Sequence, residues 1–334
     1  MLQQLHNFKG KASNFGIDGF LIAIIGMIVL AFVYPFGGSS ESPVPLAKIA
    51  NYGVSVIFFF YGLKLNPEKL KAGLSNWKLH LMVHFSTFVL FPLLVLLLHY
   101  LFPSLQSPSV WLGIFYLAAL PSTVSSSVVM VSIAKGNIPA AIFNASISSL
   151  LGIFITPLWM EVWMNDERTG QDFPLGGIII KLFVQILLPV ILGFLLHQKW
   201  GSFAEKHHTL LKKFDQSIIL IIVYTAFCES FSTHIFDALQ LKDLASLYAF
   251  VALLFFAVFI LIIISSRLLG FNREDRITCL FCGSKKSLVH GTVMSKVLFP
   301  LSPQMGIILL PIMLYHAFQL IVAGFLANKY ARES

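Results

Sequence analysis

The chain has 334 residues, of which 57% are apolar and 11% charged, with a net charge of +8 and three cysteines. Its mean hydropathy is +0.83, whereas an ordinary globular domain has about 25% charged residues. These values exclude a soluble globular domain, a disordered chain and a disulfide scaffold. We therefore expect an all-α polytopic membrane protein whose surroundings are the lipid bilayer.

Ten apolar segments are each about long enough to cross a bilayer, which takes roughly 20 apolar residues per helix. They cover residues 16–36, 44–63, 79–102, 109–134, 138–163, 174–197, 214–234, 244–269, 276–299 and 303–328. A secretory signal is the alternative for the first segment, but its apolar stretch is long and no small-residue cleavage pattern follows it. Ten transmembrane helices are predicted.

Lysine and arginine residues are distributed unevenly between the two sides of these segments. With the amino terminus inside, the outer side receives Lys48, Arg168, Lys181 and Lys242, and most of the 23 cationic residues fall on the inner side. Cytoplasmic loops carry an excess of Lys and Arg. The distribution predicts a multi-pass protein of the plasma membrane with both termini cytoplasmic. It also argues against a nucleic-acid partner, because the charge follows one side of a membrane.

The two halves of the chain carry similar polar segments. Residues 121–135 align with residues 282–296 at an offset of 161, so that Ser126 matches Ser287 and Lys135 matches Lys296. A helix with proline at its second position is expected after each segment, beginning at Ile138 and at Ser302. Because each half has five segments, residues 1–163 and 174–334 are predicted to form two inverted five-helix repeats.

Both aligned segments place polar residues at mid-membrane depth, where unsatisfied polar groups are costly. Pro121 and Gly283, each beside serines, favour interruption of the two helices. Paired broken helices that form a substrate or ion site are the preferred interpretation, and kinked helices packed through small residues are the alternative. The candidate site residues on these segments are Ser125, Ser126, Ser127, Gly283, Ser284, Lys285, Lys286 and Ser287.

The segments 120–127, 134–137 and 282–288 resemble those of the bile acid:sodium symporter superfamily, and more narrowly its bacterial branch related to the seventh vertebrate member. The resemblance covers essentially the whole chain, and it implies that the membrane is the bacterial inner membrane. It implies a panel domain of helices 1, 2, 6 and 7 and a core domain of helices 3–5 and 8–10, in which broken helices 4 and 9 cross. It also implies a secondary active transporter of a small organic anion, which works by alternating access between panel and core.

The resemblance further implies a place for sodium behind the crossing. Carried over by position, Na⁺ would lie near Ser126, Ser127 and Asn144, with Ser148 close by, and Thr87 falls near a glutamine ligand of the third helix. The ninth helix departs from the sodium-coupled pattern, because Leu280 and Ser284 stand where those members have a glutamate and a glutamine. This departure puts sodium coupling in doubt. No organic cofactor is expected, and the coupling ion is left open between Na⁺, H⁺ and none.

The adjacent lysines Lys285 and Lys286 carry the main functional hypothesis. An ammonium has one positive charge and three donors, so one of the lysines is expected to replace a coupling ion or to bind an anionic substrate. It would change its protonation during transport, because burial disfavours the charged form. The structural alternative is a lysine that locks the crossing through hydroxyl or carboxylate partners.

Four further polar residues each allow two interpretations. His290 follows Lys286 by four residues and is expected on the same helical face, as a proton relay or as the partner of a hydroxyl. Glu229 is either a cleft residue that approaches the lysines in one state or a carboxylate at the water interface. His316 and Gln319 face the site or bond between helices.

Sequence motifs distinguish between the competing functions. The chain has no Gly-x-Ser-x-Gly, no His-Glu-x-x-His and no paired intramembrane aspartates, so an enzyme is not expected. The alternative to a transporter is a non-transporting, ligand-binding regulator of membrane ion homeostasis. The expected partner is a small, anionic molecule, and the sequence leaves the oligomeric state open.

Overall fold

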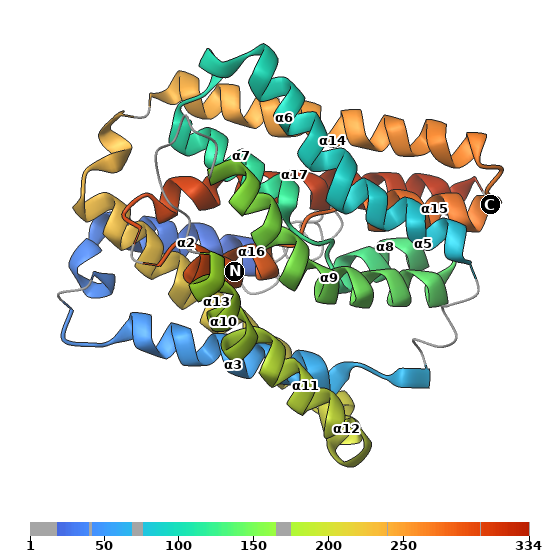
Figure 1. Ribbon diagram of the computed structural model, residues 1–334, viewed down its shortest axis with the longest axis horizontal. Coiled ribbons are helices and arrows are strands. Elements are labelled where there is room, and N and C mark those ends of the chain that lie inside the picture. Colours follow the sequence, from blue (N-terminus) through green and yellow to red (C-terminus); the bar gives the residue numbers. More distant parts are fainter. Residues whose placement is uncertain are drawn as a thin grey trace, which may run out of the picture.

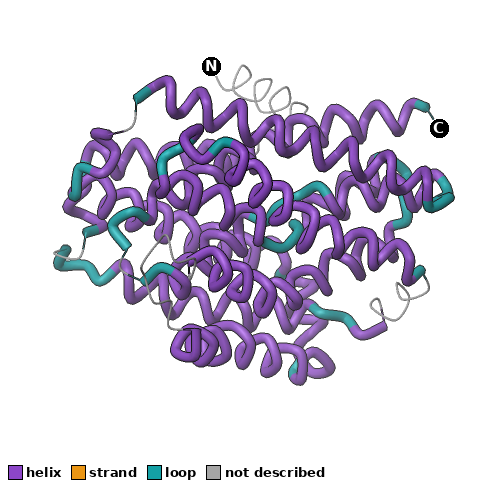
Figure 2. Tube along the Cα trace, turned by 45° about the horizontal axis from the view of Figure 1, so that its top comes forward, coloured by secondary structure: helices purple, strands orange, loops and turns teal. Residues whose placement is uncertain are grey.

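The computed structural model describes residues 19–39, 42–68, 76–164, 175–238, 240–300 and 302–333, and all regular structure in these ranges is helical (Figure 2). Seven helices of the described chain are long and apolar enough to cross a membrane. Each of the ten predicted segments contains helix. The all-α class is therefore confirmed, and the ten-crossing count stays a prediction. The predicted cytoplasmic amino terminus lies outside the described residues.

The described part of the first half contains six helical rods. The segments in chain order are α2 (Gly19–Val33), η1 (Pro35–Gly38), α3 (Leu46–Lys64), α5 (Trp77–Phe85), η2 (Ser86–Leu90), α6 (Phe91–Leu101), η3 (Pro103–Leu105), α7 (Pro108–Ala119), α8 (Ser125–Ile133) and α9 (Ile138–Met164). The wide π-helical turn η2 joins α5 and α6 into one rod. Helix α9 begins at Ile138 with proline second, as predicted.

The second half has a similar series. Its segments are α10 (Leu175–Leu182), η4 (Phe183–Leu187), α11 (Leu188–Leu195), α12 (His197–Lys206), α13 (His208–Ser232), η5 (Ile235–Ala238), α14 (Leu241–Leu268), α15 (Arg273–Gly283), α16 (Leu288–Leu298) and α17 (Met305–Arg332). The predicted helix start at Ser302 is wrong. Ser302 and Pro303 form a turn that Met305 closes by donating to the Ser302 carbonyl (3.1 Å), and Ser230 of α13 donates to the Pro303 carbonyl (2.7 Å).

Most helix contacts fall within two sets of mutual neighbours, which meet where α13 packs against α16 and α17 and where α10 packs against α9 and α16. Helix α3 lies against α11 and α13, and α2 lies against α13. Helix α17 lies against α7 and α14, and α15 lies against α5, α8 and α9. Figure 1 shows α3 and α11 along its lower part and α14, α15 and α17 across its upper part. Helix α17 also contacts α8 and α16, and Arg273 of α15 donates to a carbonyl of α17. Both interrupted pairs, α7/α8 and α15/α16, therefore lie beside α17.

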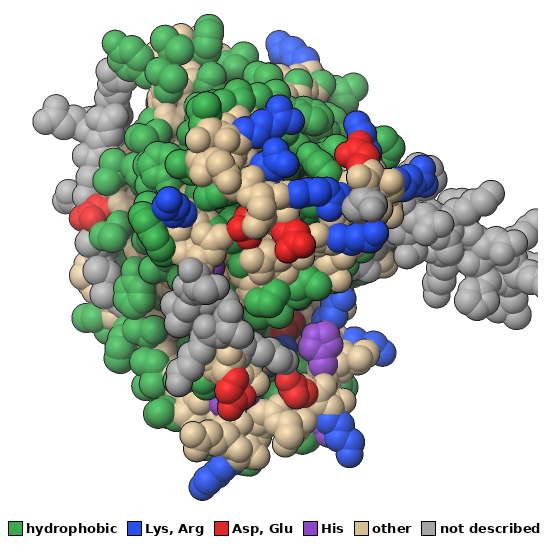
Figure 3. Space-filling view, turned by 90° about the vertical axis from the view of Figure 1, so that its right-hand side faces the viewer, with side chains coloured by type: hydrophobic (Ala, Val, Ile, Leu, Met, Phe, Trp, Pro, Cys, Tyr) green, Lys and Arg blue, Asp and Glu red, His purple; other side chains and the backbone are tan. Residues whose placement is uncertain are grey.

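Lysine and arginine side chains gather on one end of the molecule. Figure 3 views the right-hand side of Figure 1, where the carboxyl end of α17 lies, and shows blue side chains spread over that face. Arg267 ends α14, Arg273 begins α15, and Lys329 and Arg332 lie in the last turn of α17. The positive-inside rule makes this face the expected cytoplasmic one.

Two glycines allow α3 and α11 to approach closely. A β-carbon at Gly62 would overlap the backbone carbonyl of Val190, and one at Gly193 would overlap the carbonyl of Phe59. Small residues at such contacts let the backbones of membrane helices pack directly. The contact is reciprocal, so each glycine accommodates the backbone of the opposite helix.

We expect Gly62→Ala to lower the thermal midpoint of the protein purified in detergent, because overpacking of a close contact costs about 1–3 kcal/mol. Gly26→Ala is the matched control, since no atom lies within 4 Å of the β-carbon it would add. Alanine also favours a helix over glycine by roughly 0.5–1 kcal/mol. A Gly62→Ala midpoint equal to or above that of the control would contradict the close packing.

Candidate functional site

The first interruption separates α7 from α8 at residues 120–124. Leu120 has an extended backbone (φ −69°, ψ 152°), as expected before a proline. The backbone N–H of Ser122 donates to Ser148 Oγ of α9 (2.9 Å), and Ser122 Oγ donates to the carbonyl of Cys282 (2.6 Å). Ser148 thus supports the interrupted backbone, which is the role the structure gives this predicted site residue.

The second interruption separates α15 from α16 at residues 284–287. Ser287 is the N-cap of α16, and its own N–H donates to the Pro121 carbonyl (2.9 Å). Gly283 is the last residue of α15, and a β-carbon there would lie 3.1 Å from Ile262 Cδ1. The two predicted interruptions are both present, and they meet backbone to backbone.

Lys286 occupies the centre of this meeting point and is fully buried. Its Nζ donates to three backbone carbonyls, those of Thr87 (2.6 Å), Ala118 (2.6 Å) and Leu120 (2.8 Å). The ammonium also lies 4.2 Å from the centre of the Phe91 ring. Its three protons are therefore matched by three oxygens, and Ala118 and Leu120 place it at the carboxyl end of α7, where a cation is favoured.

The third oxygen is available because of Pro92. Phe91 donates to the Ser86 carbonyl five residues back, and Pro92 has no N–H, so the Thr87 carbonyl lacks the donor that a continuing wide turn would supply. Lys286 takes the Thr87 carbonyl, and Trp159 Nε1 donates to the Phe88 carbonyl (2.7 Å). Thr87 thus contributes through its backbone, while its hydroxyl donates to the Val83 carbonyl (2.9 Å).

Gln319 and Tyr315 of α17 hold the unwound segment. Gln319 accepts from the Lys286 N–H (2.9 Å) and donates to the Lys286 carbonyl (2.8 Å). Tyr315 donates to the Ser284 carbonyl (2.6 Å), and Ser284 Oγ donates to the Leu280 carbonyl (2.6 Å). Gln319 also contacts His316 Nδ1 (2.9 Å), so both predicted α17 residues bond within the core.

Lys285 is also fully buried but has a different surrounding. Its Nζ donates to the Ser126 carbonyl (3.0 Å) and lies 5.8 Å from the centre of the Phe281 ring. Within the described residues, the ion pairs lie away from both lysines. Adjacent lysines therefore differ in coordination, and Lys286 is the one held like a bound cation.

The serines of α8 form a hydroxyl cluster around Thr123. Thr123 Oγ1 lies 2.8 Å from Ser126 Oγ and 2.7 Å from Ser127 Oγ. Ser127 is buried, Ser126 half-buried and Ser125 exposed. Asn144, the third predicted neighbour of sodium, lies 3.1 Å from His80 Nδ1 through Oδ1 and donates to the Ala140 carbonyl (2.9 Å).

His290 lies where α16 faces α3. Its Nδ1 is 2.9 Å from Ser287 Oγ, and its ring centre is 5.8 Å from that of Phe58 and 6.0 Å from that of Tyr61. The expectation that it shares a helical face with Lys286 is wrong, because α16 begins only at Leu288. The interruption removes the four-residue relation, and the hydroxyl-bonded reading of His290 fits this contact.

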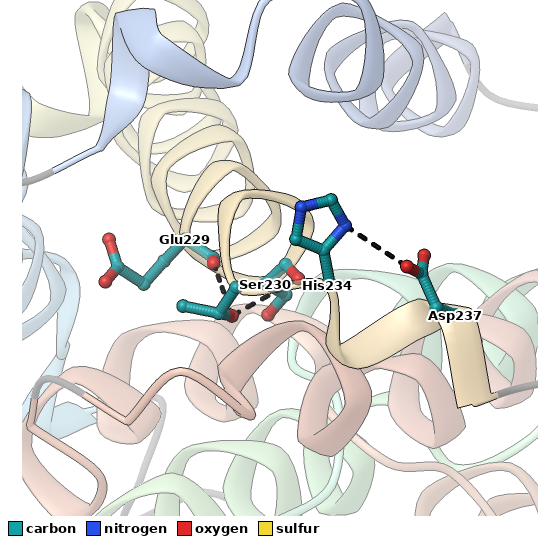
Figure 4. A network of polar contacts seen from close by, with 5 residues as sticks. Glu229, Ser230, His234 and Asp237 are labelled. Carbon is teal, nitrogen blue, oxygen red and sulfur yellow. Dashed lines mark hydrogen bonds and ion pairs between the residues drawn. The ribbon is translucent and has the colours of Figure 1, made fainter.

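Glu229 lies near the carboxyl end of α13 and is half-buried. Figure 4 shows its carboxylate directed away from His234 and Asp237, which pair with each other at 3.1 Å. One turn earlier, Thr225 Oγ1 accepts from Lys296 Nζ of α16 (3.1 Å). Glu229 follows Thr225 by about one turn of α13, so it lies on the face of α13 that Lys296 approaches. Lys296 is a different lysine from the two that the sequence singled out.

Two residues that contribute contacts to this region, Lys296 and Asp275, were not predicted from the sequence. Lys296 was aligned with Lys135 but given no role, because its partner depends on α13 approaching α16. Asp275 is buried and accepts from Asn76 Nδ2 (2.7 Å) and Asn137 Nδ2 (2.9 Å), the residues that cap α5 and α9. Asparagines just before two helices were the available signal, but their shared carboxylate follows from the packing alone.

Comparison with known proteins assigns the family. The model of the SBF-like CPA transporter family matches residues 18–332. The chain belongs to this family. It is 40% identical over 317 residues to an uncharacterized protein of Pseudomonas aeruginosa, covering 95% of this chain and 93% of that protein.

Other relatives carry functional names. The chain is 37% identical to Escherichia coli YfeH, provisionally named a symporter, over 95% of this chain and 94% of YfeH. It is 31% identical to sodium/bile acid cotransporter 7-B of Xenopus laevis, over 92% of this chain and 90% of that protein. Membership of the bile acid:sodium symporter superfamily, expected from the two polar segments, is confirmed.

We expect Lys286→Met to lower the thermal midpoint far more than Lys285→Met. Methionine keeps the length of the side chain but leaves the carbonyls of Thr87, Ala118 and Leu120 without their donor, and each such group costs about 1–3 kcal/mol. Lys285→Met removes the donor from one carbonyl and is the matched control. Equal midpoints of the two variants in detergent would contradict the assignment of Lys286 as the central cation.

Proposed function

We propose that this protein is a secondary transporter of a small organic anion that works without bound sodium, by movement of a core against a panel. The family carries the transporter assignment. The panel comprises α2, α3 and α10–α13, and the core comprises α5–α9 and α14–α17. The two sets of mutual neighbours in the packing support this division.

The coordination of Lys286 carries the sodium-independent part of the proposal. Three backbone carbonyls at 2.6–2.8 Å from one positive charge are the kind of oxygen environment that a small cation takes. The ammonium fills that environment from within the chain. A second cation there would meet like charge in a medium of low dielectric constant. Lys286 therefore supplies a positive charge beside Thr87, the position near a third-helix ligand of sodium-coupled members, and Lys285 supplies one at the Ser126 carbonyl.

Lys296 is the proposed contact for the substrate anion. Lys285 and Lys286 have their ammonium groups turned into the core, whereas Lys296 reaches from α16 to α13, across the boundary between core and panel. Its hydrogen-bond partner, Thr225 Oγ1, is neutral and is readily exchanged for a carboxylate or sulfonate. Glu229, one turn after Thr225 on the same face of α13, provides a counter-charge while no substrate is bound.

Contacts across the same boundary favour movement of rigid bodies. Tyr61 of α3 donates to the Ser146 carbonyl of α9 (2.9 Å), and Ser230 of α13 accepts from the Gly306 N–H of α17 (3.0 Å). These are neutral hydrogen bonds, each worth about 0.5–1.5 kcal/mol. The backbone bonds that join the two interruptions lie inside the core and stay intact during such a movement.

The test is flux in proteoliposomes with Na⁺, K⁺ or choline outside at constant ionic strength. The probes are a set of carboxylates and sulfonates that includes taurocholate. We expect uptake of at least one anion to be equal in the three salts, and the thermal midpoint to be the same in Na⁺ and choline. A saturable rise of the midpoint in Na⁺ alone would overturn the sodium-independent mechanism. Saturable anion binding without flux would favour the regulator.

We expect Lys296→Gln to reduce anion uptake about tenfold or more while leaving the thermal midpoint within one or two degrees of the wild type. A charge-assisted hydrogen bond is worth about 1.5–3 kcal/mol, whereas the amide keeps the bond to Thr225. Lys48→Gln is the control for general loss of positive charge, because Lys48 is an exposed residue of α3. Unchanged uptake by Lys296→Gln, or an equal loss in Lys48→Gln, would remove Lys296 from the substrate site.

A further inference from the structure

A cavity of about 190 Å³ lies at the end of the molecule where cationic side chains gather. It is enclosed by the end of α14, the beginning of α15 and the end of α17. Its walls are formed by Ile263, Ser266, Arg267, Arg273, Arg276, Ile277, Leu280, Tyr330 and Glu333. Three of these nine residues are arginines and one is a glutamate, so the lining has a net charge of +2.

The floor and the rim of this cavity differ in chemistry. Ser266, Ile277 and Leu280 form a floor that is buried to at least 97%. Arg273 and Arg276 are half-buried and Arg267 is exposed. A cationic rim over a closed, partly apolar floor distinguishes the cavity from scattered surface arginines.

One arginine is fixed and two are available to a ligand. Arg273 Nη2 donates to the Tyr330 carbonyl (2.6 Å), which ties α15 to α17 and sets one wall. Arg267 and Arg276 line the same cavity as Arg273 and Tyr330, so the three arginines meet at one place. The carboxylate of Glu333 opposes the positive charge of the arginines. Its Oε1 lies 4.0 Å from Nζ of Lys329, a residue that does not line the cavity.

We infer that this cavity is a binding site for a phosphate group, carried by an anionic lipid headgroup or by a free phosphate. Guanidinium groups match phosphate oxygens with two parallel N–H donors. Cationic pockets between membrane helices on the cytoplasmic side bind phosphorylated headgroups. The volume exceeds that of a single water molecule, about 30 Å³ in the liquid, several times over, so a phosphate and its remaining water fit.

The site is continuous with the interrupted helix. Leu280 lines the cavity, and its carbonyl accepts both the N–H (3.2 Å) and the hydroxyl (2.6 Å) of Ser284. A bound phosphate would hold α14, α15 and α17 together one turn before the interruption. Binding is therefore expected to stabilise the folded chain, and it is independent of the identity of the transported anion.

The test is the thermal midpoint of the full chain in detergent, titrated at constant ionic strength. The probes are dioctanoyl phosphatidylglycerol, dioctanoyl phosphatidylcholine and inorganic phosphate. We expect a saturable rise with phosphatidylglycerol or with inorganic phosphate and none with phosphatidylcholine. A rise with the lipid alone identifies a headgroup as the source, and a rise with inorganic phosphate shows that the free anion suffices.

Variants locate the binding. Arg276→Gln and Arg267→Gln should each weaken the apparent affinity at least tenfold, and Glu333→Gln should tighten it, because it removes the negative charge from the lining. Arg332→Gln is the matched control, since Arg332 is exposed in the last turn of α17 outside the lining. The absence of a saturable rise, an equal loss in Arg332→Gln, or an unchanged affinity in Glu333→Gln would each overturn the inference. The Glu333→Gln result stands even where an arginine variant fails to fold.

Discussion

Interrupting a helix inside a membrane leaves backbone donors and acceptors that have to find partners within the protein, because lipid offers none. The centre of this molecule is arranged to meet that requirement. The side chains of Lys286, Gln319 and Tyr315 form hydrogen bonds with backbone groups that the two interruptions leave free. Thr156 of α9 donates to the Ala119 carbonyl (2.8 Å) and completes the end of α7. The interruptions are therefore rigid, and movement has to occur elsewhere.

The positive charges of the core differ in depth and in partner. Lys286 is surrounded by carbonyl dipoles, which stabilise a cation without neutralising it. Lys296 contacts the hydroxyl of Thr225, one turn before Glu229 on α13. The first arrangement suits a permanent structural charge, since burial without these carbonyls would be costly. The second suits a charge that changes partners, since a neutral hydroxyl is exchanged at little cost.

Much of the fold follows from local patterns in the sequence. Apolar length located the helices, and Pro121 and Gly283 located the interruptions, because a missing N–H and a small side chain act at the residue itself. The choice between Lys285 and Lys286 was not accessible in this way. Neighbouring residues of an unwound segment point in directions that the surrounding helices determine. The error at His290 has the same origin, because a helical spacing rule was applied across a segment that is not helical.

Other features depend on contacts between distant segments. Asp275 is an ordinary first-turn carboxylate in sequence, and only the packing of α5 and α9 against α15 makes it a shared partner of two helix caps. The position of Lys296 likewise depends on which helix lies opposite α16. Such residues are set by tertiary approach, so hydrophobic periodicity carries no trace of them.

The wide turn η2 has a consequence for the direction in which α6 faces. A π-helical turn is equivalent to one residue inserted into an α-helix, and one residue corresponds to a rotation of about 100° around the helix axis. Deleting a residue from 86–90 would turn Phe91 and everything after it by that angle. The aromatic ring that lies against the Lys286 ammonium would then face another neighbour. The inserted residue therefore sets the rotation of α6 relative to α5 about their common axis. A homologue without it would need a different residue to face this cation.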